Sequence, residues 1–272
     1  MTQTMTLVYY WRHNFGQKPQ IVAELYKLRL GAVDYAGGMS LSTDPATYQG
    51  RGKSVITLLN EIGKGTRDCL LACDYRLQQG GKMVVGRPNT ISGLAGEVIG
   101  GVSYKVLRLQ DEKELDYSTW PVFAACHPQQ GTFCRWKSME NCIATWYHTG
   151  SLPVEVGSLT PGQLEVLCYE YMKDGNIIER LLCPIGRALR EIDIVGIAAD
   201  GSRVFAQVTF ATNRNILMDK ASRLLEFGHG RGKCIMFCPV LDFSFEGVEC
   251  ISIPKVFEAA DKTMLRAMLS PM

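Results

Sequence analysis

A polar pair inside two apolar strands is the feature of this sequence best suited to chemistry. The segment from residue 191 to residue 210 reads EIDIVGIAADGSRVFAQVTF, in which two strand-like runs flank an Asp-Gly turn. A three-residue loop with a bulge around Asp200 and Gly201 would place Asp193 directly opposite Gln207, whereas a two-residue turn would put them on opposite faces. We expect the bulged loop, because it lets both polar groups share one cleft.

A carboxylate beside an amide oxygen indicates a metal site. Glu165, on the helix that precedes the strands, would add a third oxygen ligand to Asp193 and Gln207, and such a pocket suits Mg²⁺. A metal held there can activate water and stabilise the charge that develops on a phosphate. The alternative is structural: Asp193 accepts hydrogen bonds from the turn or from Arg190, and Gln207 is a half-buried polar partner.

The helix that carries Glu165 has clear start and stop signals. Thr160, Pro161 and Gln163 form a capping box with proline at the first helical position, and the helix runs through QLEVLCYEYMKDG to a glycine. At 100° per residue Glu165 falls at the edge of the apolar stripe, whereas Glu170 points away. Of these two acids, we expect Glu165 to face the interior.

The segments after the hairpin complete an α/β pattern. NRNILMDKASRLLEFG predicts a helix from about Asn215 to Gly228, and KCIMFCP predicts a buried strand. VECISIP predicts a further strand, and PKVFEAADKTMLRAML predicts a terminal helix. The order helix, strand, strand, helix, strand indicates an α/β (α+β) domain with a mixed central sheet flanked by helices.

The first half of the chain is β-rich. Its strand-like runs, rich in valine and aromatic residues, are TLVYYW, DCLLACDY, KMVVGR, GEVIGGVSYKVLRL and WPVFAACH. QIVAELYKLRLG and KSVITLLNEIG have helical periodicity, so we expect a small curved or barrel-like sheet with one or two helices. TGSLPVEVGSLTPG predicts a linker, which gives an N-terminal domain at 1–155 and a C-terminal domain at 156–272.

Three runs of the C-terminal half, LTPGQLEVLCYEYM, EIDIVG and DGSRVFAQVTF, resemble the core of the restriction-endonuclease-like nucleases. This is the PD-(D/E)XK fold, and the resemblance is greatest to its Mrr-type branch, over roughly residues 158–240. The resemblance matches the family's helical glutamate to Glu165, its strand aspartate to Asp193 and its glutamine to Gln207. It implies a Mg²⁺-dependent DNA endonuclease in which these residues are catalytic and bind the metal, with Mn²⁺ as a substitute and RNA as an alternative to DNA.

Thr209 stands where the family's Gln-x-Lys pattern has its lysine. That lysine orients the attacking water and offsets negative charge in the transition state, and threonine cannot supply the charge. Lys220 lies on the apolar face of the next helix, where its amine must reach water or meet an acidic site. In some relatives of the fold the catalytic lysine has migrated to this helix, so we expect Lys220 to be the displaced catalytic cation.

Two other interpretations of this half remain open. The missing lysine favours a nuclease fold that has lost catalysis and acts as a nucleic-acid-binding or assembly module. The C-terminal domain could also be an unrelated α/β module with a fortuitous aspartate and glutamine. Arg214 and Lys233, near the ends of the same unit, are expected to be phosphate contacts or plain surface charges.

Aromatic residues gather late in the N-terminal half: Trp120, Phe123, Phe133, Trp136, Trp146 and Tyr147. This layout is faintly similar to the EVE and PUA-like barrels, which bind modified bases. Aromatic rings around a cleft could stack on a flipped base, and the alternative is that they form the core. Together with the nuclease resemblance, a base-reading module implies modification-dependent restriction or defence.

The composition is that of an ordinary globular protein. The chain has 272 residues, 46% of them hydrophobic and 21% charged, with a formal net charge of +2. This charge gives no global field for nucleic acid, so binding would rest on local patches. No secretion signal or membrane-spanning run is evident, which favours a cytoplasmic protein without a membrane partner.

The ten cysteines contain no C-x-x-C pair and lie in apolar surroundings, so we expect them to be reduced and buried. One cluster, Cys126, His127, Cys134, Cys142 and His148, fits no standard zinc spacing. Cutting both strands of DNA needs two active sites, so we expect a homodimer.

Overall fold

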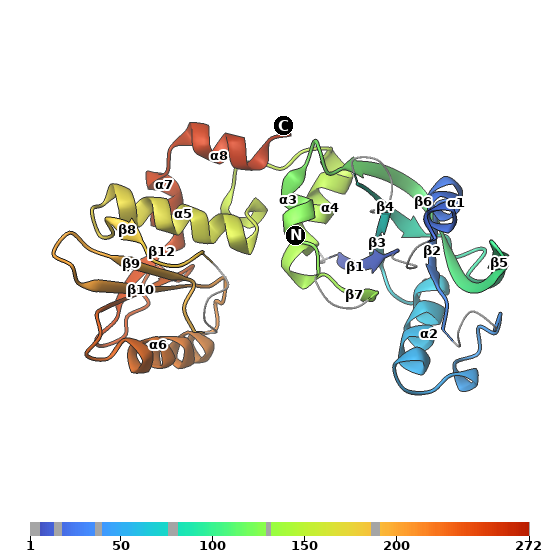
Figure 1. Cartoon of the computed structure of the whole chain (residues 1–272), viewed down its shortest axis with the longest axis horizontal. Coiled ribbons are helices and arrows are strands. Elements are labelled where there is room, and N and C mark those ends of the chain that lie inside the picture. The colour runs from blue at the N-terminus through green and yellow to red at the C-terminus, as the bar shows by residue number, and fades with distance from the viewer. Residues whose placement is uncertain are drawn as a thin grey trace. The chain divides into compact units, whose positions relative to one another are not determined.

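The computed structural model describes residues 6–13, 18–35, 40–75, 81–128, 132–185 and 191–271. The chain divides into two compact units, Met1–Leu152 with Ser270–Met272, and Pro153–Leu269. We call them the N-terminal unit and the C-terminal unit (Figure 1). The division falls within the glycine- and proline-rich segment 149–162. No helix in the described ranges is long and apolar enough to cross a membrane.

The N-terminal unit is built on a seven-stranded sheet in the order β2-β6-β4-β3-β1-β7, with β5 also paired to β6. Its elements are β1 (Leu7–Arg12), α1 (Pro19–Leu28), β2 (Leu30–Val33), η1 (Pro45–Thr47), α2 (Gly50–Gly63), β3 (Cys69–Tyr75), β4 (Lys82–Pro88), β5 (Leu94–Ile99), β6 (Val102–Asp116), α3 (Pro121–Ala125), β7 (Phe133–Arg135), η2 (Lys137–Met139) and α4 (Glu140–Thr149). The sheet is mixed, because β1 is parallel to β3 and antiparallel to β7.

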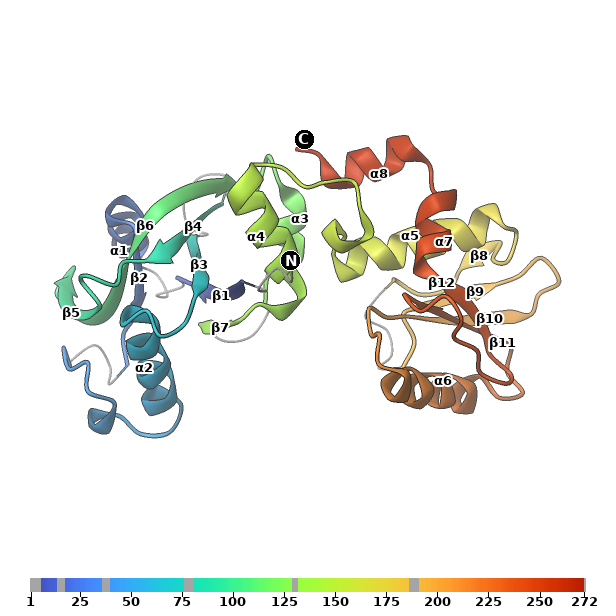
Figure 2. The same ribbon diagram turned by 180° about the vertical axis from the view of Figure 1, so that it is seen from behind.

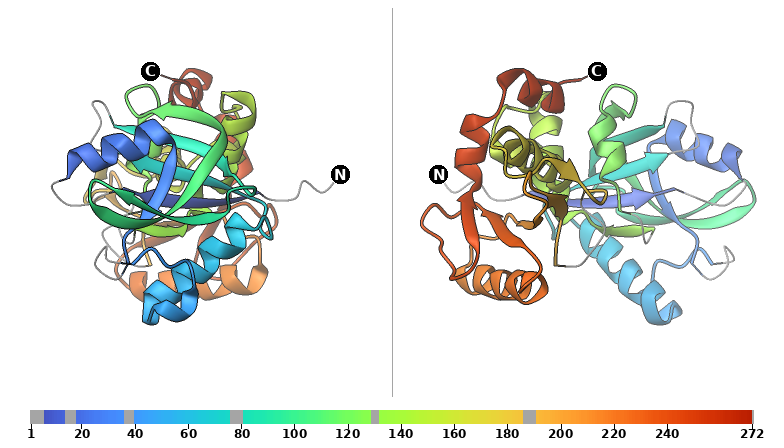
Figure 3. Two further views of the ribbon diagram at one scale, coloured as in Figure 1. Left: turned by 90° about the vertical axis from the view of Figure 1, so that its right-hand side faces the viewer. Right: turned by 60° about the vertical axis from the view of Figure 1, so that its left-hand side comes forward.

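The long strand β6 gives this sheet its curl. The first part of β6 pairs with β5 and β2, and its last part pairs with β4, where the register shifts between Val85 and Arg87. Such a shift bends and twists a strand, so one strand can join two differently oriented parts of the sheet. The resulting curl is visible in Figure 3.

Two sequence expectations for the N-terminal unit need revision. The predicted strand WPVFAACH was wrong: the segment forms α3, because Pro121 occupies its first turn, where a fixed φ and a missing N–H favour a helix. The run GEVIGGVSYKVLRL forms two strands, β5 and β6, and Ile99 pairs with Val102 across the turn. Gly100 and Gly101 have φ values of 56° and 76°, which a two-residue hairpin of this kind requires.

The late aromatic residues of the N-terminal unit are core residues. All six are at most 8% exposed, as for Trp120, and Phe123 is fully buried. Phe133 packs edge-on against Trp11, and Trp146 packs edge-on against Phe123. A ring buried on both faces cannot stack on a base, so of the two interpretations of these residues the one that places them in the core holds.

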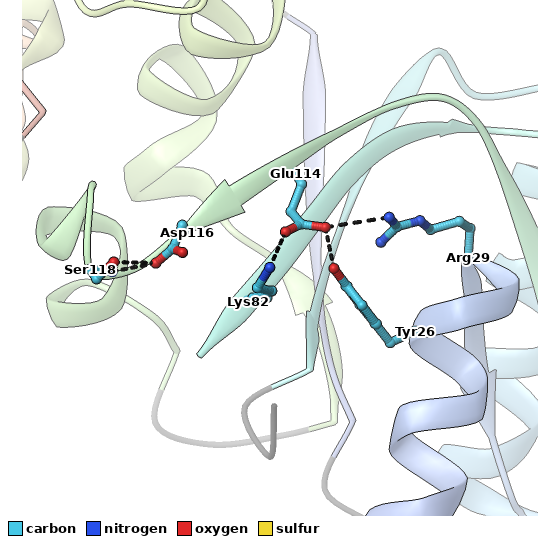
Figure 4. A network of polar contacts seen from close by, with 6 residues as sticks. All are labelled: Tyr26, Arg29, Lys82, Glu114, Asp116 and Ser118. Carbon is cyan, nitrogen blue, oxygen red and sulfur yellow. Dashed lines mark hydrogen bonds and ion pairs between the residues drawn. The ribbon is translucent and has the colours of Figure 1, made fainter. Parts of the chain in front are cut away.

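A surface network around Glu114 ties α1 to strands β4 and β6 (Figure 4). The Glu114 carboxylate accepts hydrogen bonds from Lys82 Nζ at 2.5 Å, from Arg29 Nη2 at 3.3 Å and from the Tyr26 hydroxyl. Partial burial acts to raise the pKa of Glu114, but these three donors together outweigh it and hold the pKa below its ordinary value. The network therefore stabilises the packing of α1 on the sheet while its carboxylate is ionised.

The C-terminal unit contains a five-stranded sheet in the order β12-β11-β10-β9-β8. Its elements are η3 (Val156–Ser158), α5 (Pro161–Asp174), β8 (Arg180–Leu181), β9 (Ile194–Ile197), β10 (Arg203–Val208), α6 (Arg214–Gly228), β11 (Lys233–Cys238), β12 (Glu249–Ser252), α7 (Ile253–Ala259) and α8 (Lys262–Leu269). Strand β9 is antiparallel to β8 and β10, whereas β10, β11 and β12 are parallel. The expected mixed α/β arrangement is confirmed.

Helices cover both faces of this sheet, with α5 and α6 on opposite sides (Figures 1 and 2). On the α6 side, Leu217, Ala221 and Leu224 join Phe205 and Met236 in one buried cluster. On the α5 side, Tyr171 packs edge-on against Phe237, the strand neighbour of Met236. Side chains alternate between the two faces of a strand, so Gln207, two residues after Phe205, lies on the α6 side with it. Asp193 is opposite Gln207 and therefore lies on the same side.

The predicted terminal helix is interrupted. Ala260 has extended backbone angles, and the Asp261 carboxylate accepts a hydrogen bond of 2.9 Å from the Thr263 N–H at the start of α8. An aspartate just before a helix accepts a hydrogen bond from a backbone N–H in the first turn that has no partner within the helix. Asp261 therefore marks the start of a new helix, and α7 and α8 are separate.

Candidate functional site

The hairpin between β9 and β10 has the bulged loop that the sequence predicts. The Ala198 N–H donates to the Ser202 carbonyl at 2.9 Å, and the Gly201 N–H donates to the Ala198 carbonyl at 3.0 Å. Gly201 has a φ of 82°, the left-handed conformation of the bulge residue, and the Asp200 side chain accepts a hydrogen bond from the Ser202 N–H. Three residues therefore close the loop, and the prediction is confirmed.

The register of the hairpin brings Asp193 and Gln207 together. Ala206 pairs with Ile194, so the next position along the hairpin sets Gln207 opposite Asp193. Gln207 Nε2 donates to Asp193 Oδ2 at 3.2 Å, and the Val208 N–H donates to the same oxygen at 2.7 Å. No hydrogen bond from a described residue reaches Oδ1. Among the described residues, the hydrogen bonds to Asp193 therefore all go to Oδ2.

Burial dominates the electrostatics of Asp193. Burial raises the pKa of Asp193, and the hydrogen bonds from Val208 and Gln207 and the positive charge of Lys220 lower it without cancelling that effect. A carboxylate in this position carries a negative charge that its surroundings do not fully compensate. Arg190, the alternative partner of Asp193, lies outside the described residues.

Glu165 lies on α5 in a half-buried position. The capping box of Thr160 and Gln163 is present as predicted and sets the start of this helix. One turn after Glu165, the buried Cys168 thiol has a raised pKa, first because of burial and then because of the negative charges of Glu165 and Asp193. The charges of both carboxylates thus act on the same buried thiol.

Lys220 and Thr209 occupy the two places considered for the catalytic cation. Lys220 is half-buried on α6, and its charge acts on Asp193, although its amine forms no hydrogen bond or ion pair with a described residue. Thr209 is 8% exposed, and its hydroxyl accepts a hydrogen bond of 3.2 Å from the Ala211 N–H. The hydroxyl of Thr209 therefore serves the local backbone, and Lys220 is the lysine that acts on the carboxylate.

Arg214 and Lys233 lie at different ends of the sheet. Arg214 opens α6, just after the end of β10, and its Nη2 pairs with Asp242 Oδ2 at 2.7 Å. Lys233 is opposite Val204, three residues before Gln207, and its Nζ pairs with Glu249 at 2.5 Å. Three residues of strand span about 10 Å, so Lys233 lies at the end of β10 away from Gln207.

Within the described ranges, no group of three or more His, Cys, Asp and Glu side chains could hold a metal ion. This includes the cluster of cysteines and histidines between Cys126 and His148, and all ten cysteines are free thiols. The expected set of Asp193, Glu165 and Gln207 contains two acids and an amide, of which Asp193 and Gln207 are joined by a hydrogen bond. Its fit to a hard cation rests on Asp193, which is half-buried and whose Oδ1 accepts no hydrogen bond from the part of the chain that the structure describes.

Two parts of the site were missed by sequence reasoning. The Val208 N–H has no sequence signature, because any residue but proline offers the same donor. Cys168 could have been found, since it lies three residues after Glu165 and so on the same side of the helix.

Comparisons with known proteins leave the chain without an assigned relative. No family model matches it. No curated protein matches it. A solved structure described as "Structure of EndoMS-dsDNA2 complex" is 11% identical with a TM-score of 0.21, and the match covers 66% of this chain and 58% of that chain. This chain thus spans less than two thirds of that protein, and a TM-score this low carries no argument.

Proposed function

We propose that the C-terminal unit is a metal-dependent nuclease domain of the PD-(D/E)XK type, closest to the Mrr branch, that hydrolyses phosphodiester bonds in DNA. The observation that carries the proposal is the Asp193 carboxylate. It is desolvated, it is held on Oδ2 by Gln207 and Val208, and it lies within the field of Lys220. Perturbed carboxylates of this kind are typical of functional sites.

Asp193 and Glu165 are the metal ligands in this proposal. When bound, Mg²⁺ or Mn²⁺ would lower the pKa of a water molecule and stabilise the charge that develops on the phosphate. Asp193 would present Oδ1 to the cation from the end of a rigid hairpin. Glu165 would reach the cation from α5, which covers the other face of the sheet, and its charge, like that of Asp193, acts on the buried Cys168 thiol.

Lys220 is the catalytic cation in this proposal. Its ammonium is not committed to a described partner, and its charge already acts on Asp193. A positive charge held beside the metal ligand can offset the negative charge of the transition state, as the lysine of the Gln-x-Lys pattern does. The hydrophobic neighbours of Lys220 on α6, Leu217, Ala221 and Leu224, fix the helix from which it extends.

The test is cleavage of modified and unmodified DNA, and of RNA, with Mg²⁺ or Mn²⁺. Asp193→Ala and Lys220→Ala should each lower the rate by about 100-fold or more, as the loss of one electrostatic contact to a transition state does. Arg223→Ala is the matched control, because Arg223 lies on the same helix and pairs with Asp219 at 3.1 Å on the surface. A Lys220→Ala protein that cuts as well as Arg223→Ala would contradict the role of Lys220.

A second candidate function has its own supporting observation. Thr209 occupies the place of the family's lysine, is buried, and uses its hydroxyl to bind the Ala211 N–H. Such a buried, locally bonded residue in place of the lysine is expected of a nuclease fold that has lost catalysis and retains nucleic-acid binding or assembly. This second function predicts that the protein binds DNA but does not cut it with any metal ion. It also predicts that Lys220→Ala leaves DNA binding unchanged.

The wider role that we propose is modification-dependent restriction or defence by a cytoplasmic homodimer, with the N-terminal unit as the nucleic-acid-binding or base-reading module. Its support is the resemblance of the sequence to EVE, PUA-like and Mrr-type proteins. The six buried aromatic rings take no part in it. Cleavage of methylated against unmethylated DNA, together with the mass of the protein in solution, tests this role.

A further inference from the structure

We infer that Gln207 is a positioning residue for Asp193, which holds the carboxylate by donating a hydrogen bond and does not itself bind the metal. This inference rests on the proposed function and replaces the sequence-based expectation that Gln207 is a ligand. It assigns the oxygen of Asp193 that faces the cation.

The two carboxylate oxygens of Asp193 have different surroundings. Oδ2 accepts hydrogen bonds from Gln207 Nε2 at 3.2 Å and from the Val208 N–H at 2.7 Å. With two donors in place, Oδ2 is committed to the hairpin, and the torsion angles of the aspartate are fixed. Oδ1 accepts no hydrogen bond from a described residue, so it is the atom that can bind a cation.

The orientation of the Gln207 amide follows from electrostatics. With Nε2 toward Asp193, a donor faces a carboxylate oxygen. The reversed amide would place its own oxygen at the same short distance, so that two acceptors would face each other in a buried place. Gln207 is only 5% exposed, so water cannot relieve that repulsion.

The neighbours of Gln207 restrict its movement. Strand β10 lies between β9 and β11, and Gln207 is opposite Met236 on the β11 side. A side chain enclosed in the middle of a sheet loses little additional entropy when it orders a neighbour. Donors that hydrogen-bond to a metal ligand fix its orientation, and their loss lowers metal affinity by about 10–100-fold.

The experiment observes the Gln207 amide directly in the full-length protein labelled with ¹⁵N. Gln207→Glu, which has the same shape but no side-chain NH₂ group, assigns the signal. The bonded amide proton should exchange with solvent at least about tenfold more slowly than an exposed glutamine amide, because it is both buried and bonded. Asp193→Ala should remove this protection.

Adding Mg²⁺ then distinguishes the two roles of Gln207. A positioning residue keeps its protected amide proton and its bond to Asp193 in the metal-bound state. A ligand must turn its oxygen to the metal, so the protection would be lost, and this outcome would overturn the inference.

Mg²⁺ titration by calorimetry provides the second readout. Gln207→Met keeps the shape of the side chain without its donor, and we expect an affinity about tenfold lower than that of the wild type. A thermal melt of the metal-free variant verifies that it is folded. Unchanged affinity would overturn the positioning role. If the wild type shows no Mg²⁺ binding that Asp193→Ala removes, the proposed function fails, whatever the amide does.

Discussion

Gln207 and Asp193 face each other across the β9–β10 hairpin, joined by a hydrogen bond of 3.2 Å from Nε2 to Oδ2. The pair exists because the loop has three residues with a left-handed glycine, Gly201, at its end. With a two-residue turn the same strands would send these side chains to opposite faces of the sheet.

Asp193→Asn should stabilise the metal-free protein near pH 7.5. Burial raises the pKa of Asp193 above its ordinary value of 3.8, so the ionised form lowers stability at any pH above the folded-state pKa. This cost disappears as pH falls through the folded-state pKa to below 3.8, and the advantage of the variant should disappear with it. We expect a melting temperature higher by roughly 2–4 °C, the effect of about 1 kcal/mol in a domain of this size.

The control for this prediction is Asp242→Asn, since Asp242 is exposed and paired with Arg214. It should leave the melting temperature nearly unchanged. An Asp193→Asn protein that melts lower than the wild type would mean that the carboxylate is a structural group, and the functional interpretation of its burial would be wrong.

Glu114→Gln should lower stability at neutral pH and have no effect in acid. The pKa of Glu114 is lowered by Lys82, Tyr26 and Arg29, so its contribution is complete above its ordinary pKa of 4.5 and is lost as pH falls through the lower, folded-state pKa. The carboxylate is partly exposed, so the effect should be roughly 1 kcal/mol or less and smaller in high salt. Urea unfolding of both proteins at several pH values measures it, and a difference that persists in strong acid would refute the electrostatic origin.

Gly201→Ala should destabilise the hairpin. The φ of Gly201 is 82°, and no atom lies within 4 Å of an added Cβ, so the cost is backbone strain alone, about 1 kcal/mol. Gly162→Ala is the matched control, because Gly162 also has open space around it but lies in the first turn of α5 without a positive φ. Equal melting temperatures of the two variants would show that the bulged loop does not need its glycine.

Thr209→Lys should not create a better site. Thr209 is 8% exposed and accepts a hydrogen bond from the Ala211 N–H, so the longer, charged side chain loses that bond and must leave the interior. We expect a loss of about 1–3 kcal/mol in urea unfolding, with Thr209→Val showing the part due to the hydroxyl. Full restoration of cutting in a Thr209→Lys, Lys220→Ala double variant would contradict the view that position 209 can no longer hold the catalytic lysine.

The local signals of the C-terminal unit were strong enough to predict its elements. The capping box of Thr160 and Gln163, the Asp-Gly loop and the apolar stripe of α6 each act within one turn or one hairpin. Only the register of the hairpin was needed to place Asp193 beside Gln207.

The features that the sequence did not reveal are those that tertiary contacts determine. The residues of α3 have the composition of a strand, and Pro121 together with burial of Phe123 makes them a helix. The aromatic residues that suggested a cleft are enclosed by the packing of helices on the sheet, which composition cannot reveal. The break between α7 and α8 depends on the capping bond of Asp261, because the apolar periodicity continues across it.

The central claim is that Asp193 is a metal-binding catalytic carboxylate, and Mg²⁺-dependent cleavage of DNA by the wild type and by Asp193→Asn tests it most directly. Asparagine has the shape of aspartate and can accept both hydrogen bonds that Oδ2 now accepts, so the fold should be retained. The account predicts that the wild type cuts, and that Asp193→Asn is folded, at least as stable, and slower by about 100-fold or more. An Asp193→Asn protein that cuts DNA at the wild-type rate would contradict it.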